Sequence, residues 1–81
     1  MNDVEAKISQ FVVERFLFGE GTVDPAADLF ADGVMDSLGV IQLIAFLRET
    51  FGVEVRTSDI TQENFHSVAS TVAYVRAQTG S

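Results

Sequence analysis

The sequence predicts an all-α fold, a four-helix bundle with a long loop between the first and second helices and a short third helix. Apolar residues recur at helical spacing in three stretches, around residues 3–18, 37–51 and 67–78. Glycines and the single proline separate these stretches, as is usual where helices end. Residues 52–57 alternate like a strand, but the chain has no second strand to pair with them, so a bundle is favoured.

Length and composition indicate one domain, which we expect to span residues 1–81. A hydrophobic content of 47% is ordinary for a globular chain with one modest core. Because there is no cysteine, a disulfide framework and a thiolate zinc site are excluded, and any thioester sulfur must come from a cofactor. No apolar run reaches the length of a membrane span, and the N-terminus is not typical of a signal peptide. We therefore expect a soluble, cytoplasmic protein and a monomer.

Negative charge is concentrated just before residue 37. The formal net charge is −7, and most of it comes from five acidic residues with no base among them: Glu20, Asp24, Asp28, Asp32 and Asp36. Nucleic acid is disfavoured as a partner, because neutralising its phosphates requires a basic face. Partners with basic docking surfaces are favoured, mainly through faster encounter.

The first helix is expected over residues 3–18, with Asn2 or Asp3 as its cap. Gly19 and Gly21 then end it. The apolar positions at helical spacing are Val4, Ile8, Phe11, Val12 and Phe16, and the apolar side is widened by Val13, Leu17 and Phe18.

Residues 19–36 are expected to form a long, ordered loop. Its aspartates lie four residues apart, but Pro25, Gly33 and repulsion between like charges argue against one continuous helix. A short turn over residues 25–29 stays open, since proline suits the first helical position. The apolar residues expected to anchor the loop on the core are Leu29, Phe30, Val34 and Met35. A loop of this length in a small domain is usually functional.

The second helix is expected over residues 37–51. Asp36 and Ser37 both suit its N-cap, and Gly52 suits the left-handed residue that closes a helix. Ser37 is therefore expected near solvent at the positive end of the helix dipole, a favourable place for a phosphate.

This helix has two apolar stripes. The stripe that we assign to the core consists of Val40, Leu43, Ile44, Leu47 and Phe51. The second stripe begins beside Ser37 and consists of Leu38, Ile41, Ala45 and Arg48. Burying both stripes is difficult in so small a chain, so we expect the second to contact a partner; burial in the core is the alternative.

The C-terminal third is expected to hold the short third helix over residues 58–64, begun by Thr57, Ser58 or Thr61, and a last helix over residues 67–78. The residues expected to point inward are Phe65, Val68, Val72 and Val75.

Other chemistries are poorly supported, and we expect no catalytic and no metal-binding residues. The aspartates lie four apart, whereas a calcium loop of the EF-hand type alternates its oxygen ligands and ends in glutamate. His66 is the only histidine, and a solvated or capping role suits it better than that of a general base. Ser37 lacks the preceding glycine of a hydrolase nucleophile elbow.

Three segments together resemble the acyl and peptidyl carrier proteins. They are Asp36-Ser37-Leu38 at the head of an apolar helix, Phe51-Gly52-Val53-Glu54-Val55 at its end, and Phe65-His66-Ser67-Val68 further on. The tripeptide alone is common, and its spacing to the other two segments makes the match specific. The resemblance runs from about Val4 to Val75.

The resemblance implies that a phosphopantetheinyl transferase moves 4′-phosphopantetheine from coenzyme A onto Ser37, with Asp36 helping it to place its metal and the serine. The thiol of this arm would carry an acyl or aminoacyl group as a thioester. An adenylating ligase or acyltransferase would load it, and downstream biosynthetic enzymes would receive it. The chain itself would not be an enzyme. Its partner surface would be made by Leu38, Ile41 and Ala45, flanked by Gln42 and Glu49.

Within that family, Gly33-Val34-Met35-Asp36-Ser37, followed by Gly39 and Gln42, is most similar to D-alanyl and discrete aminoacyl carriers. Fatty-acid carriers typically have one residue between the glycine and the aspartate, and acids where this chain has Gln42 and Arg48. Phe46 is also large where many relatives are small, which implies a narrow space for cargo. We therefore expect a stand-alone carrier served by a dedicated adenylating enzyme. The alternative is a non-carrier helical adaptor that binds partners through the same helix surface.

Overall fold

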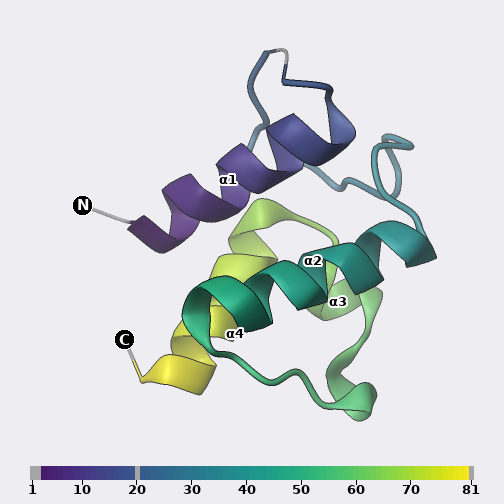
Figure 1. The fold of residues 1–81 in the computed structure, drawn as a ribbon. Coiled ribbons are helices and arrows are strands. Elements are labelled where there is room, and N and C mark those ends of the chain that lie inside the picture. Colours follow the sequence, from purple (N-terminus) through teal and green to yellow (C-terminus); the bar gives the residue numbers. More distant parts are fainter. Residues whose placement is uncertain (1–2, 20, 81) are drawn as a thin grey trace.

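The computed structural model describes residues 3–19 and 21–80, and all the regular structure in these ranges is helical. The elements are α1 (Asp3–Phe16), α2 (Ser37–Phe51), a 3₁₀ turn η1 (Thr57–Asp59), α3 (Gln62–Phe65) and α4 (Val68–Thr79). Figure 1 shows α1, α2 and α4 gathered into one bundle, with the long loop between α1 and α2 running past the start of α2. The all-α class with a short third helix is confirmed.

Side chains from the three long helices fill one core. α1 packs most extensively against α4, and α3 also lies on α4. The fully buried side chains that these elements share are Ile8, Val12, Leu43, Leu47, Phe65, Val68, Thr71 and Val75. Of the α2 stripe assigned to the core, Val40, Leu43 and Leu47 are buried, whereas Ile44 and Phe51 are half-buried. Gly39, which is not part of that stripe, is buried as well. None of the described helices is long and apolar enough to cross a membrane.

The long loop is held on the bundle by backbone hydrogen bonds in its middle. The Leu29 N–H donates to the His66 carbonyl (2.7 Å), and the Ala69 N–H donates to the Pro25 carbonyl (2.8 Å). Leu29 and Met35 are buried, so the loop contributes to the core. The loop is ordered by these contacts, and no continuous helix forms within its described part.

The first helix is shorter than the expected 3–18. Phe18 takes a left-handed φ of 56° and is 89% exposed, so it leaves the apolar side of the helix instead of widening it. The Gly19 N–H then reaches back to the Val13 carbonyl (2.9 Å) and closes the helix. The alternative cap Asn2 lies outside the described residues.

The expected third helix over residues 58–64 is wrong in extent, because the structure divides this segment into η1 and α3. Thr61 lies between them with extended backbone (φ −132°, ψ 159°), and its hydroxyl accepts the Asn64 N–H as the N-cap of α3. An extended residue cannot continue a helix, so the segment breaks there. The last helix begins one residue later than expected, since Ser67 is its N-cap in a reciprocal capping box with Ser70.

Tyr74 connects α4 to η1. Its hydroxyl donates to Asp59 Oδ2 (2.9 Å), and its ring lies against that of Phe65, with centroids 5.3 Å apart. Burial raises the pKa of the Tyr74 hydroxyl, and the hydrogen bond and negative charge of Asp59 raise that pKa further, while Arg56 opposes them.

The raised pKa of Tyr74 predicts a loss of stability in alkali. Above about pH 10, where an unfolded tyrosine ionises, the folded chain binds more protons than the unfolded chain. The contribution of this group to the free energy of unfolding is therefore complete below about pH 10 and is lost as the pH rises through the folded-state pKa. Tyr74 is the only tyrosine and tryptophan is absent, so ultraviolet absorbance of tyrosinate follows this residue alone. Urea unfolding at several alkaline pH values measures the free energy of unfolding of the wild type and of Tyr74→Phe. We expect Tyr74→Phe to lose less of this free energy in alkali than the wild type, because it has no hydroxyl to ionise. A tyrosinate midpoint at or below about pH 10 would contradict it.

Candidate functional site

The start of α2 is fixed by Asp36. This residue has extended backbone (φ −130°, ψ −171°), and its Oδ1 accepts the Gly39 N–H at 2.9 Å. Its carbonyl accepts the Val40 N–H at 3.0 Å. Of the two cap candidates, the structure therefore selects Asp36, and Ser37 becomes the first residue of the helix. The Ser37 side chain is exposed.

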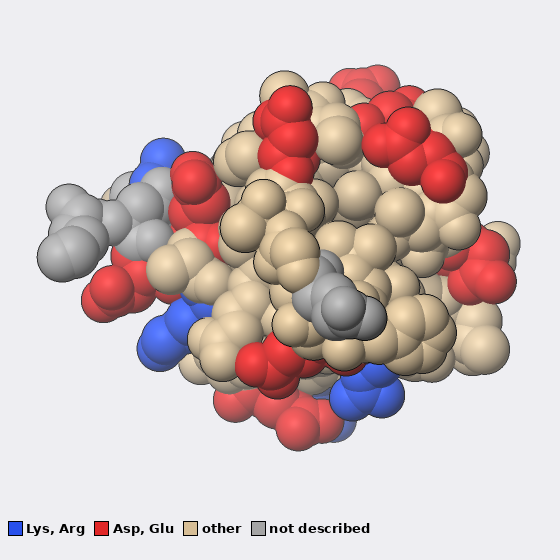
Figure 2. Space-filling view, turned by 90° about the horizontal axis from the view of Figure 1, so that it is seen from above, with Lys and Arg blue, Asp and Glu red and all other residues tan. Residues whose placement is uncertain are grey.

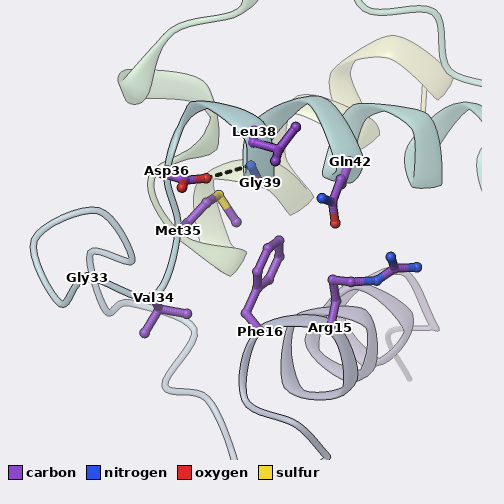
Figure 3. Close-up of a pocket in the computed structure, with 9 residues that line it drawn as sticks. All are labelled: Arg15, Phe16, Gly33, Val34, Met35, Asp36, Leu38, Gly39 and Gln42. Carbon is purple, nitrogen blue, oxygen red and sulfur yellow. Dashed lines mark hydrogen bonds between the residues drawn. The ribbon is translucent and has the colours of Figure 1, made fainter.

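Close packing beneath Ser37 fixes the direction of the helix. A Cβ at Gly39 would lie 2.9 Å from Met35 Cγ and 3.0 Å from Phe16 Cε1, so only glycine lets these side chains approach. Figure 3 shows the Phe16 ring pointing from α1 toward Met35 and Gly39, with the Asp36 carboxylate on the Gly39 N–H above it. The inner side of this first turn is thus filled, and Ser37 is left on the outer side.

Two grooves flank this helix start. The first, of about 380 Å³, lies toward α1 and is lined by Arg15, Phe16, Gly33, Val34, Met35, Asp36, Leu38, Gly39 and Gln42. The second, of about 330 Å³, lies toward α3 and is lined by Phe30, Ser37, Val40, Ile41, Ile60, Thr61 and Gln62. Ser37 itself lines the second groove, so a group attached to its hydroxyl starts at that groove's edge.

The second stripe of α2 faces solvent. Leu38 is 62% exposed and Ile41 is 60% exposed, while Ala45 and Glu49 are exposed and Gln42 is half-buried. The predicted partner residues are therefore accessible on one side of α2, beginning next to Ser37. Burial in the core, the alternative for Leu38, Ile41 and Ala45, is wrong.

Sequence reasoning missed Ile60, which extends this apolar surface across the second groove. Ile60 is 41% exposed and lies in the connection between η1 and α3. Its only signal in the sequence is an apolar residue between Asp59 and Thr61, and nothing local relates it to Ser37.

His66, Asp24 and Asp28 have structural partners. The Nδ1 of His66 lies 2.9 Å from the Gln62 carbonyl and 3.2 Å from the Glu63 carbonyl, so it must carry a proton and cap the end of α3. Asp24 Oδ1 accepts the Ala26 N–H, and Asp28 Oδ1 accepts those of Phe30 and Ala31. Among the residues described here, no group of three or more acidic, histidine or cysteine side chains could hold a metal ion.

The surface is predominantly acidic. Figure 2 shows carboxylates spread over one face of the molecule and far fewer basic side chains. With a net charge of −7, the chain attracts basic surfaces over a distance of about a Debye length, ~8–10 Å at physiological salt.

Comparison with known proteins agrees with this geometry. The family described as "Phosphopantetheine attachment site" matches residues 7–75. D-alanyl carrier protein 2 of Lactiplantibacillus plantarum is 33% identical over 76 residues, covering 93% of this chain and 92% of the relative. The D-alanyl carrier protein of Streptococcus pyogenes serotype M5 is 37% identical over 68 residues, covering 80% of this chain and 86% of the relative. A solved structure described as "Structure of KstB-PCP(apo)" has a TM-score of 0.69 and 35% identity, covering 98% of this chain and 88% of that chain.

The predicted family, its carrier role and its cofactor are confirmed by these matches. The helical arrangement agrees as well, because the similarity in structure extends over almost the whole chain. The chain therefore belongs to the phosphopantetheine-dependent carrier proteins, non-catalytic proteins that hold an acyl or aminoacyl group on a covalently attached 4′-phosphopantetheine.

Proposed function

We propose that Ser37 is the attachment point of the phosphopantetheine arm. The observation that carries this proposal is the exposed side chain of Ser37 in the first turn of α2, beside two grooves. The first N–H groups of a helix have no partner within the helix, and together with the dipole they favour an anion. A phosphodiester fits at this position for that reason. When bound, the arm supplies the thiol that this cysteine-free chain lacks.

Asp36 is proposed to have two roles. Its Oδ1 accepts the Gly39 N–H, which holds the first turn of α2 and thereby the direction of Ser37. Its side chain is exposed, so the same carboxylate is accessible to a transferase and its metal ion. The start of α2 and the recognition of this site by the transferase would thus both depend on the Asp36 side chain.

For the cargo, we propose a small acyl or aminoacyl group, loaded by an adenylating ligase and passed to downstream biosynthetic enzymes. Between α1 and α2, the rings of Phe11 and Phe46 stack at 4.3 Å, and Phe51 meets Phe46 edge-on at 6.1 Å. These half-buried rings pack between the two helices, which disfavours a long acyl chain there. The two D-alanyl carrier relatives support an amino acid as cargo. Coenzyme A as the arm's donor favours a cytoplasmic carrier.

The proposed partner surface consists of Leu38, Ile41, Gln42, Ala45 and Glu49. Exposed apolar side chains next to an attachment point supply contact area, while polar and charged neighbours at the edge set orientation. The surrounding negative charge favours partners with basic docking surfaces.

The first prediction concerns attachment. Incubation of the purified chain with coenzyme A and a broad-range phosphopantetheinyl transferase should add the mass of one phosphopantetheinyl group, as seen by intact-protein mass spectrometry. Ser37→Ala should gain nothing, while Ser58→Ala, which changes another exposed serine, should be modified like the wild type. An unmodified wild type, under conditions that modify a control carrier, would favour the adaptor alternative.

The second prediction separates the two roles of Asp36. Asp36→Ala removes the cap and should lower the free energy of unfolding by about 1 kcal/mol, measured by urea unfolding followed by circular dichroism. Asp36→Asn keeps an oxygen that can accept the Gly39 N–H, so it should retain most of that stability and yet be modified more slowly by the transferase. Modification of Asp36→Asn at the wild-type rate would refute the proposed role of the carboxylate.

The third prediction concerns the partner surface. Ile41→Ser should change the free energy of unfolding by less than about 0.5 kcal/mol, because the side chain is already exposed. The kcat/KM of loading by the adenylating ligase should fall roughly tenfold, the equivalent of about 1.4 kcal/mol of lost contact. Phe18→Ser, an exposed apolar residue outside the surface, is the matched control and should load normally. Equal loading of both variants would contradict this surface.

A further inference from the structure

The groove that Ser37 lines has walls from two different parts of the chain. One wall is α2, with Val40 and Ile41, and the other comes from Ile60, Thr61 and Gln62. Ile60 belongs to no helix, since its backbone (φ −81°, ψ 82°) ends η1 before α3 begins. The shape of the groove therefore depends on what holds this short connection in place.

Asp59, the residue before Ile60, is the point at which the connection is fixed. Its carbonyl accepts the Thr61 N–H (2.9 Å) and Asn64 Nδ2 (2.8 Å), which are local bonds. Its carboxylate accepts the Tyr74 hydroxyl (2.9 Å), which comes from the middle of α4, 15 residues later. This last bond connects the groove wall to the core.

Tyr74 is well suited to act as a fixed donor. It is 8% exposed, and its ring lies against the fully buried Phe65. A ring held in this way has few rotamers left, so the position of its hydroxyl is set by the packing of α4. The hydroxyl also interacts with the Arg56 backbone at the start of η1, in the same segment, whereas the contact with Phe65 is made by the ring alone.

We propose that the Asp59–Tyr74 hydrogen bond is a latch that holds Ile60 as the outer wall of the groove beside Ser37. Tyr74 and Asp59 are then positioning residues for the arm. The inference rests on the proposed attachment at Ser37. The occupant that fits the groove is the pantetheine part of the arm itself. Phe30, Val40, Ile41 and Ile60 offer apolar contact to its methyl groups, and Thr61 and Gln62 offer hydrogen bonds to its amides.

The latch predicts a specific effect of removing one hydroxyl. In Tyr74→Phe the ring and its packing remain, so the bundle stays folded with a modest loss of stability. The segment carrying Ile60 loses its bond to α4, and the arm loses an ordered wall. Asp59→Ala breaks the same bond from the other side, whereas Asp59→Asn keeps an acceptor for the tyrosine hydroxyl.

Amide chemical shifts of the ¹⁵N-labelled chain, recorded before and after attachment of the arm, test this. In the wild type, attachment should shift the amides of residues 60–62 in addition to those next to Ser37. In Tyr74→Phe and Asp59→Ala the changes at residues 60–62 should fall below about half, while those next to Ser37 persist. Asp59→Asn should behave like the wild type. The control Ser70→Ala loses the capping box of α4, away from the groove, and should also behave like the wild type despite its lower stability.

The outcomes distinguish the latch from the carrier function. An arm that attaches without shifting residues 60–62 in the wild type would overturn the proposed groove, and undiminished shifts in Tyr74→Phe would overturn the latch. Equal losses in Tyr74→Phe and Ser70→Ala would also overturn it, because they would reflect stability alone. Failure of Ser37 to accept the arm would overturn both this inference and the proposed function.

Discussion

The attachment point depends on the packing of one helical turn. Asp36 accepts the Gly39 N–H, and the missing side chain of Gly39 lets Met35 and Phe16 come close underneath. A cap without this packing would leave the helix start free to fray, and the packing without the cap would leave buried N–H groups unsatisfied. Together they leave Ser37 facing solvent.

The acidic loop has a local explanation as well as an electrostatic one. Asp24, Asp28 and Asp36 each accept backbone N–H groups two or three residues ahead, which is how short acidic side chains form turns and caps. These three aspartates therefore mark local turns and the helix start. The same carboxylates contribute to the net negative charge that favours basic partners.

The parts of the fold that the sequence predicts are those governed by local rules. The residue range of α2, its closing Gly52 and its two stripes follow from periodicity and from the left-handed preference of glycine. The choice of Asp36 over Ser37 as the cap could not be made, because both side chains suit that position and only backbone angles separate them. The left-handed backbone of Phe18 could not be predicted either, because phenylalanine rarely adopts that conformation. The bond between Asp59 and Tyr74 is a tertiary contact between two elements, and no local pattern predicts it.

The stacked Phe11 and Phe46 rings have a consequence for how the loaded and unloaded forms are told apart. A protein that encloses its cargo can change shape when it is filled, and a partner can sense that change from outside. Here half-buried aromatic rings pack between α1 and α2, so we expect a small group on the tether to stay outside the bundle and to leave its shape unchanged. An enzyme that must choose the charged form over the empty one has to inspect the end of the tether directly.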